Sequence, residues 1–151
     1  MGTWDHGSFD NDTASDWAYC FTPPKKSFFK RGKPDLFAYP ASAIDVGITT
    51  KAGEWLDSTE CEEAIAAAEC IAAAKGRPTE GLPEEVESWL GTLEGQQPKP
   101  DLIQRAIQVM NRVRNDEKSD LRVLWSEQQE DKQPDPKWLA CMDDLIARLG
   151  S

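Results

Sequence analysis

The stretch from Asp57 to Lys75 constrains the fold of this chain more than any other segment. Its apolar residues recur at helical spacing and form one face, made by Cys61, Ala64, Ile65, Ala68, Ile71 and Ala72. Further alanines cover most of the remaining surface, namely Ala66, Ala67, Ala73 and Ala74. A helix with small side chains on nearly every side lets its neighbours pack closely all round it. We therefore expect residues 57–75 to form the central helix of the fold.

Polar residues mark the start of this helix. Ser58 or Thr59 is expected to cap the N-terminus, because a hydroxyl oxygen there accepts a hydrogen bond from a backbone amide of the first turn. Glu60, Glu62 and Glu63 follow at once. Carboxylates near a helix N-terminus are favoured by the helix dipole, which accounts for their position.

Five further segments carry apolar residues at the same i, i+3, i+4 spacing, and they lie near residues 12–20, 83–93, 100–115, 121–125 and 138–149. In the first of them, Ala14, Trp17, Ala18 and Phe21 share one face, so we expect Trp17 to lie in the core. Residues 22–56 contain four prolines and show no clear period. This region is predicted to be irregular; a helix in part of it and a short strand at 43–50 are the two alternatives.

These patterns predict an all-α fold. A chain of 151 residues suits one domain, since folding at this size buries roughly two thirds of the surface that the unfolded chain exposes. We expect residues 1–151 to form one compact domain, a bundle of five or six helices. Residues 1–10 of this domain are expected to form an extended N-terminal arm.

The composition is acidic throughout. The chain has 27 Asp and Glu against 17 Lys and Arg, and each half carries a net charge of −5, with 12 acids and 7 bases in residues 1–75 and 15 acids and 10 bases in residues 76–151. Every uncharged apolar run, such as 71–74, is far shorter than the ~20 residues of a membrane span. The start of the chain lacks the apolar stretch of a secretory signal, and the four cysteines stand singly. We expect a cytoplasmic protein without a membrane partner.

One basic segment interrupts this pattern. It contains Lys25, Lys26, Lys30, Arg31 and Lys33, interleaved with Phe28 and Phe29. Basic residues beside aromatic ones can bind single-stranded nucleic acid. The alternative is a solvated loop with two phenylalanines in the core, and we prefer it because the rest of the chain repels phosphate. No nucleic-acid partner is expected.

The residues offer little catalytic chemistry. His6 is the single histidine, no zinc-binding spacing is present, and no glycine-rich phosphate loop follows a strand. We therefore expect no catalytic residue, no cofactor and no metal. The alternative is that the carboxylates of Asp5, Asp10, Asp12 and Asp16 hold Mg²⁺, with His6 beside them. The competing interpretation is that Asp10 caps a helix, Asp12 complements its dipole and Asp16 is solvated.

The opening of the chain resembles a known family. The matching residues are Met1, Gly2, Thr3, Trp4, Gly7, Phe9, Asp10, Asn11, Asp12, Ala14, Asp16 and Trp17, and residues 60–74, Asp120, Leu121, Leu124, Trp125, Trp138, Arg148 and Leu149 continue the likeness. The family comprises small bacterial proteins known as domain of unknown function family 4259. The resemblance implies no catalytic residue. The family pattern implies a further regular helix at residues 25–51. The sequence of this chain departs from the family pattern in that region.

The shared opening has an expected structural role. Trp4, Phe9 and Trp17 flank a helix start, where large apolar side chains can pin the N-terminal arm to the helical body. The alternative is that Trp4, Asp5 and His6 form an exposed recognition edge.

Three functions are compatible with these features. The first is a non-catalytic protein-binding protein of the immunity or antitoxin kind, which blocks a basic toxin or effector by direct contact. Its expected contact face combines Glu84, Glu85 and Glu87 with the acidic loop of Glu127, Glu130, Asp131 and Asp135. The second is a small metal-dependent enzyme that uses the N-terminal Asp and His residues. The third is a housekeeping interaction module that exposes Trp89, Leu90 and Leu93, or Trp125. The sequence does not predict an oligomeric state.

Overall fold

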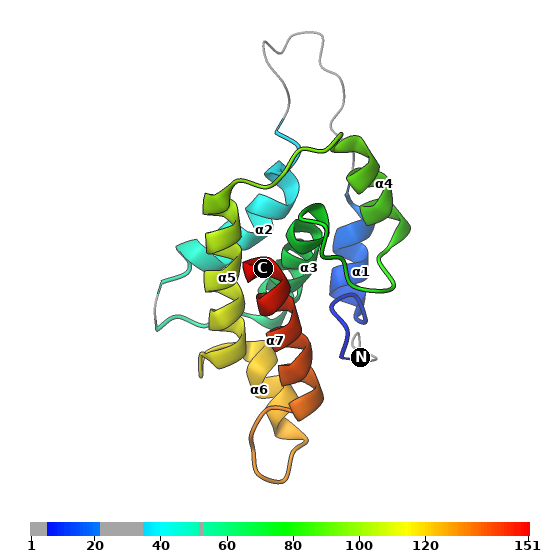
Figure 1. Ribbon diagram of the computed structural model, residues 1–151. Coiled ribbons are helices and arrows are strands. Elements are labelled where there is room, and N and C mark those ends of the chain that lie inside the picture. Colours follow the sequence, from blue (N-terminus) through cyan, green and yellow to red (C-terminus); the bar gives the residue numbers. More distant parts are fainter. Residues whose placement is uncertain (1–5, 22–34, 52) are drawn as a thin grey trace.

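The computed structural model describes residues 6–21, 35–51 and 53–151. In this part of the chain it contains seven helices and no strand (Figure 1). The helices are α1 (Asp12–Tyr19), α2 (Ala38–Thr49), α3 (Ser58–Ala74), α4 (Glu84–Thr92), α5 (Pro100–Asn115), α6 (Asp120–Glu127) and α7 (Pro136–Gly150). The all-α prediction is confirmed, whereas the expected number of five or six helices is too low.

Helix α3 lies at the centre, as its alanine content predicts. It contacts each of the other six helices, and 13 of its 17 residues are buried. Its N-cap is Asp57 and not Ser58 or Thr59, because the Asp57 carboxylate accepts a hydrogen bond from the Glu60 amide at 2.8 Å. The small side chains allow α1, α2, α5 and α7 to approach this helix together, and α3 lines both the cavity and the groove described below.

Residues 22–34 and 52 of the predicted irregular region 22–56 lie outside the described residues, and helix α2 corrects the prediction of a strand at 43–50. The segment 38–49 is a helix that packs against α3 and α5. Pro40 falls in its first turn, where a missing N–H costs no helical hydrogen bond. Gly47 faces α5 so closely that an added Cβ would lie 2.6 Å from Val109 Cγ1. Glycine is therefore required at this helix crossing despite its low helix propensity.

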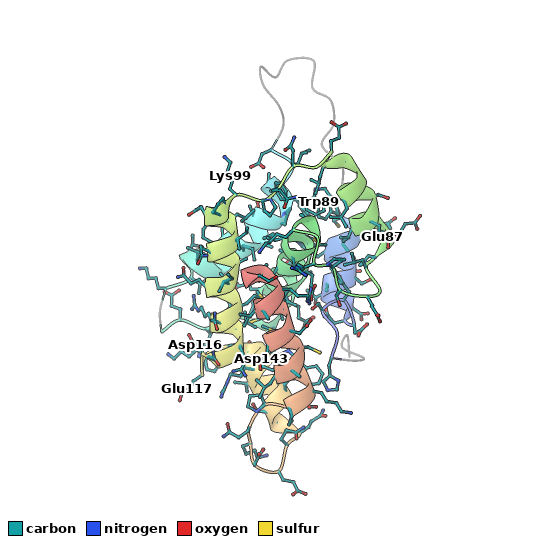
Figure 2. The ribbon with its side chains drawn as sticks, viewed as in Figure 1. Glu87, Trp89, Lys99, Asp116, Glu117 and Asp143 are labelled. Carbon is teal, nitrogen blue, oxygen red and sulfur yellow. The ribbon has the colours of Figure 1, made fainter. Side chains whose placement is uncertain are left out.

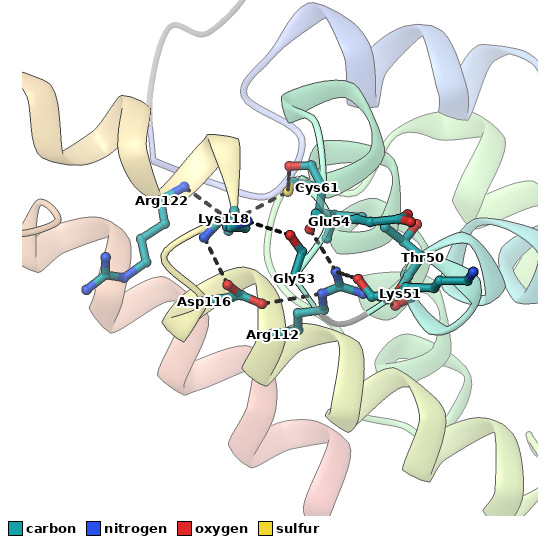
Figure 3. A network of polar contacts seen from close by, with 12 residues as sticks. Thr50, Lys51, Gly53, Glu54, Cys61, Arg112, Asp116, Lys118 and Arg122 are labelled. Atoms are coloured by element: carbon teal, nitrogen blue, oxygen red, sulfur yellow. Dashed lines mark hydrogen bonds and ion pairs between the residues drawn. The ribbon is translucent and has the colours of Figure 1, made fainter.

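The segment between α2 and α3 is fastened to α5 by one arginine. The guanidinium of Arg112 donates hydrogen bonds to the backbone carbonyls of Gly47, Thr50, Lys51 and Glu54 (Figure 3). Its Nε also lies 3.6 Å from the Asp116 carboxylate. This linker is thus held through its main chain, with Arg112 supplying the donors.

A second fastening lies beside it. The Lys118 ammonium donates to the Gly53 carbonyl at 2.6 Å (Figure 3). Leu56 and Ser119 form an isolated parallel bridge, in which the Leu56 amide donates to the Lys118 carbonyl and the Asp120 amide donates to the Leu56 carbonyl, each at 3.0 Å. The entry to α3 and the start of α6 are thereby held together.

One hydrophobic cluster contains residues from all seven helices of the described chain. Trp89 is 1% exposed, and its indole N–H donates to the Leu36 carbonyl at 2.8 Å. Figure 2 shows Trp89 on the inner side of α4, with Glu87 on the outer side. None of the helices in the described part of the chain is long and apolar enough to cross a membrane.

Candidate functional site

The N-terminal arm is attached to the far end of the chain through His6. Its Nε2 lies 2.9 Å from Asp135 Oδ2, and its ring stacks on Trp125 with the centroids 4.6 Å apart. The hydrogen bond with His6 holds the pKa of the Asp135 carboxyl below its usual value, and the bond from the Lys137 amide adds to this shift. Because Asp135 also caps α7, these contacts order the arm and the helix start together.

A second attachment reaches a buried ion pair. The Ser8 hydroxyl donates to Glu69 Oε1 at 2.7 Å. Glu69 is 2% exposed, and Arg148 donates to both of its carboxylate oxygens at 2.8 and 2.9 Å. These hydrogen bonds raise the pKa of Arg148 further above its usual value. The arrangement satisfies a buried charge and pins the arm, so it has a structural role.

A small cavity lies between these attachments. His6, Ser8, Glu62, Trp125 and Cys141 are among the residues that line it. Its volume is about 20 Å³, which suffices for about one water molecule. A substrate does not fit into this space, although the lining residues include reactive types.

The structure separates the residues of the postulated metal cluster. Asp10 accepts a hydrogen bond from the Gly7 amide at 3.1 Å, and Asp12 and Asp16 are exposed on α1. The α1 cap is Asn11, whose Oδ1 accepts from the Ala14 amide at 2.7 Å, so the prediction of Asp10 as the cap is wrong. Within the described ranges, no three His, Cys, Asp or Glu side chains are placed to hold a metal ion. Asp5 lies outside the described residues.

Two of the three aromatic residues of the opening lie against the hydrophobic core, as their expected role in attaching the N-terminal arm requires. Trp17 is in the core, and Phe9 is half-buried against it. Trp4 lies outside the described residues. Sequence reasoning missed the two polar attachments of the arm, because their partners follow 129 and 61 residues later. No periodicity in the sequence carries that information.

A groove of about 270 Å³ lies between α1, α2 and α3. It is lined by Trp17, Tyr39, Ser42, Ala43, Val46, Glu60 and Glu63. The rings of Trp17 and Tyr39 stack with their centroids 4.7 Å apart, and the Tyr39 hydroxyl donates to the Trp17 carbonyl at 2.6 Å. One wall of the groove is therefore a preformed aromatic surface.

The α3 wall of the groove is acidic. Burial raises the pKa of both Glu60 and Glu63, and the charge of Asp57 raises each of them further. Arg112 opposes the shift at Glu60. Burial also raises the pKa of Tyr39 to about 12, with Glu63 adding to the effect. A cation placed in the groove would stabilise the charged form of both carboxyl groups.

The sequence signal for this groove was present but ambiguous. Three glutamates and Asp57 within seven residues exceed what one helix start needs, yet helix dipoles alone attract such residues. The aromatic wall contains Tyr39, which lies in the region predicted to be irregular. Without α2, the glutamates have no opposing surface.

The two acidic segments of the expected contact face lie apart. Glu84, Glu85 and Glu87 occupy the first turn of α4. Glu127, Glu130 and Asp131 lie in or beside the connection between α6 and α7, at the opposite end of the molecule (Figure 1). Asp135 belongs to the His6 attachment. The prediction that both segments form one face is wrong, because α4 packs beside α1 while the α6–α7 connection projects beyond the other helices.

The apolar face expected on α4 is also absent from the surface. Trp89 and Leu93 are buried, and Leu90 is half-buried. Trp125 is half-buried beneath His6. The large exposed apolar side chains in the described chain are Tyr19, Val46, Trp55 and Leu124. Of these, Val46 lies at the groove.

Glu62 provides a test of the charge buried in α3. Burial raises the pKa of this carboxyl, Asp12 adds to the shift, and a hydrogen bond with Thr13 opposes it. The folded state therefore holds the proton more tightly than the unfolded state, so this group's contribution to stability is full below a pH near 4.5 and is lost as the pH rises through the raised pKa. We expect Glu62→Gln to be more stable than the parent at pH 7, with the difference disappearing toward pH 4.

Urea unfolding at both pH values measures this effect. Glu117→Gln serves as the control, because Glu117 is exposed and a surface substitution changes stability by about 0.5 kcal/mol at most. A Glu62→Gln protein that loses stability equally at both pH values would contradict the expectation.

A family model described as "Domain of unknown function (DUF4259)" matches residues 2–138. The match covers the arm, the groove, both acidic segments and the His6 attachment. No curated protein and no solved structure matches the chain.

Proposed function

The chain belongs to the DUF4259 family, and from this premise we propose that it is a non-catalytic protein-binding protein that inhibits a basic toxin or effector by direct contact. The observation that carries the proposal is the division of charge on its surface. The arginines of α5 and α7 are engaged within the fold, whereas the acidic groups at the two ends of the molecule are presented to solvent.

Four arginines illustrate the first half of this division. Arg105 pairs with Asp45 and Asp101, and Arg114 pairs with Asp143. Arg112 and Arg148 make the internal contacts described above. The charges of these arginines are compensated by neighbouring carboxylates, so most of the net charge of −10 is carried by other residues.

The acidic ends show the second half. Within the described ranges, no ion pair involves Glu84, Glu85, Glu87, Glu127, Glu130 or Asp131. Uncompensated carboxylates attract a basic surface over distances near the Debye length, and they accelerate association more than they tighten the complex. Such a surface suits the occlusion of an enzyme site that binds nucleic acid or phosphate. The cytoplasm is the proposed location of both partners.

Because the two ends face away from each other, one end supplies the contact. The α6–α7 end is the better supported of the two. Its loop is held at its base by Asp135, His6 and Trp125, so its acidic residues are presented on an ordered support. The carboxylates of α4, in contrast, already face the positive end of their own helix dipole.

Salt dependence tests the proposal. A tagged chain is used to recover its stoichiometric partner from the native host, and association is then followed by stopped flow between 0.1 and 1 M NaCl. The screening length falls from ~10 Å to ~3 Å over this range, so we expect the on-rate to drop by about an order of magnitude or more. The off-rate should change less, and the partner's enzymatic activity should fall as the complex forms.

Two matched variants identify the contact end. Glu127→Gln/Glu130→Gln/Asp131→Asn and Glu84→Gln/Glu85→Gln/Glu87→Gln each remove three charges. We expect both to slow association, and only the first to raise the off-rate. An on-rate that is insensitive to salt would exclude the electrostatic mechanism. If no stoichiometric partner is recovered, the inhibitor function itself is wrong.

A further inference from the structure

We propose that the contact of His6 with Asp135 and Trp125 is a pH-sensitive latch, which holds the N-terminal arm on the loop between α6 and α7 while the imidazole is protonated and loosens both segments when it is neutral. The inference rests on the proposed function in one respect, because this loop carries acidic residues that are proposed to meet a basic partner. It adds a regulation of that loop by pH.

The loop is closed by two residues that His6 contacts at the same time. The Asp135 amide donates to the Trp125 carbonyl at 3.0 Å, which brings the last turn of α6 and the start of α7 together. The imidazole meets both residues: its Nε2 lies 2.9 Å from Asp135 Oδ2, and its ring stacks on the Trp125 indole with 26° between the planes. The arm therefore meets the loop at its base, where one contact orders both segments.

Protonation of the imidazole strengthens both contacts. An imidazolium forms an ion pair with the carboxylate, and a cation on the face of an indole is attracted by its π electrons. The side chains of His6 and Asp135 are only 22% and 19% exposed, so water screens this pair less than a pair on the open surface. A neutral imidazole retains a hydrogen bond but brings no charge to either contact. The arm is therefore held more tightly when His6 is protonated.

Other ionisable groups face this site from α3 and α7, while α6 contributes the uncharged Trp125. Glu62 and Cys141 line the same small cavity as His6, and an ionised Glu62 favours the imidazolium. The charge of Lys137 acts on Asp135 and competes with His6 for it. We expect the Asp135 carboxylate to act most strongly on His6, because it is in hydrogen-bond contact with the ring.

The direction of the pH dependence follows from the mutual character of the interaction. The contact that lowers the pKa of Asp135 from its usual 3.8 also raises the pKa of His6, because each charge stabilises the other. The contribution of the pair is therefore full between about pH 4, where Asp135 is ionised, and about pH 6.5, the ordinary pKa of histidine. It is lost as the pH rises through the raised pKa of the folded state. The latch thus opens in the range where histidine acts as a switch.

The chain contains one histidine, so a single imidazole resonance reports the latch. The isotope-labelled full chain, without a histidine tag, is titrated from about pH 5 to about pH 8, and the His6 Cε1–H and the amides of Gly7 and Glu130 are followed by nuclear magnetic resonance. We expect the His6 midpoint to lie about 0.5 pH unit or more above its value in the same chain unfolded in urea. Both amides should shift with this midpoint, and these shifts should be absent in His6→Gln.

Two matched variants identify the partner of the imidazole. Asp135→Asn and Asp131→Asn each remove one carboxylate of the loop and leave an amide oxygen that can accept the same backbone hydrogen bond, from Lys137 or Gln133. We expect Asp135→Asn to lower the His6 midpoint by about 0.5 pH unit or more. Asp131→Asn should lower it by less than about 0.2 pH unit, because salt screens exposed charges.

Circular dichroism verifies that every variant is folded. An equal His6 midpoint in the parent and in Asp135→Asn, equal decreases in Asp135→Asn and Asp131→Asn, or a Glu130 amide that does not follow the His6 midpoint would each overturn the inference. If the stoichiometric partner is recovered while His6 titrates independently of Asp135, the latch falls and the proposed function stands. If His6 titrates as expected and no partner is recovered, the proposed function falls and the latch stands.

Discussion

Replacing Arg148 with methionine is expected to lower the free energy of unfolding by about 3–5 kcal/mol. Arg148 donates to both carboxylate oxygens of Glu69, and Glu69 is almost completely buried at the centre of the fold. Without the guanidinium, this carboxylate keeps one hydrogen bond within the described chain, from the Ser8 hydroxyl. A buried charge without its counter-ion is far more costly than the absence of the whole pair. Urea unfolding measures the loss.

The double variant Glu69→Met/Arg148→Met distinguishes this cause from a simple loss of packing. Because both charges are removed together, we expect it to recover most of the stability that the single variant loses. The two substitutions should therefore be strongly non-additive. A single variant that costs less than about 1 kcal/mol, or a double variant that is less stable than both single variants, would show that the pair is not the source of the effect.

The second large effect is expected at Trp17. Its side chain is 7% exposed, stacks on Tyr39 and meets Phe21 edge to face with the ring centroids 5.6 Å apart. Replacement by alanine removes these contacts and leaves a cavity beside Ala14 and Ala18. We expect Trp17→Ala to lose about 3–5 kcal/mol of unfolding free energy, with a clearly lower melting temperature.

Trp55→Ala is the matched control, since the same side chain is removed from a position that is 55% exposed. Its unfolding free energy should change by less than about 1 kcal/mol. Trp17→Phe, which retains an aromatic ring next to Tyr39, should fall between the two. An unchanged melting temperature in Trp17→Ala would mean that α1 contributes little to the core.

Six of the seven described helices follow from local patterns in the sequence. Their apolar residues repeat at helical spacing, and proline or acidic residues mark their starts, as Pro100 does for α5. The central position of α3 could also be inferred, because only small side chains permit neighbours on every side. This part of the fold is encoded within windows of about fifteen residues, which sequence reasoning can interpret.

Helix α2 could not be predicted in this way. Ile44, Val46 and Ile48 alternate as in a strand, while Pro40 and Gly47 are residues that usually interrupt helices. Contacts with α3 and α5 override these preferences, and Gly47 has a packing reason that appears only when Val109 lies opposite. The resemblance to the family implied a helix here where the local pattern did not.

The candidate sites depended on the same missing information. His6 and Asp10 are neighbours in sequence, yet His6 is paired with Asp135. Glu60 and Glu63 were predicted to complement a helix dipole, and they do lie at that end of α3. Only the placement of α1 and α2 turns them into one wall of a groove. Long-range packing, and not residue type, decides which of these acids lines the groove.

The clamp formed by Arg112 has a consequence for how this sequence can diverge. Its guanidinium recognises the main-chain oxygens of Gly47, Thr50, Lys51 and Glu54, and every amino acid, proline included, carries that oxygen. Natural selection can therefore change the side chains at positions 50, 51 and 54 without removing an acceptor from the clamp. Substitution at position 112, in contrast, removes all the donors at once. The linker side chains can thus vary during evolution, whereas Arg112 in α5 cannot be replaced without losing these hydrogen bonds.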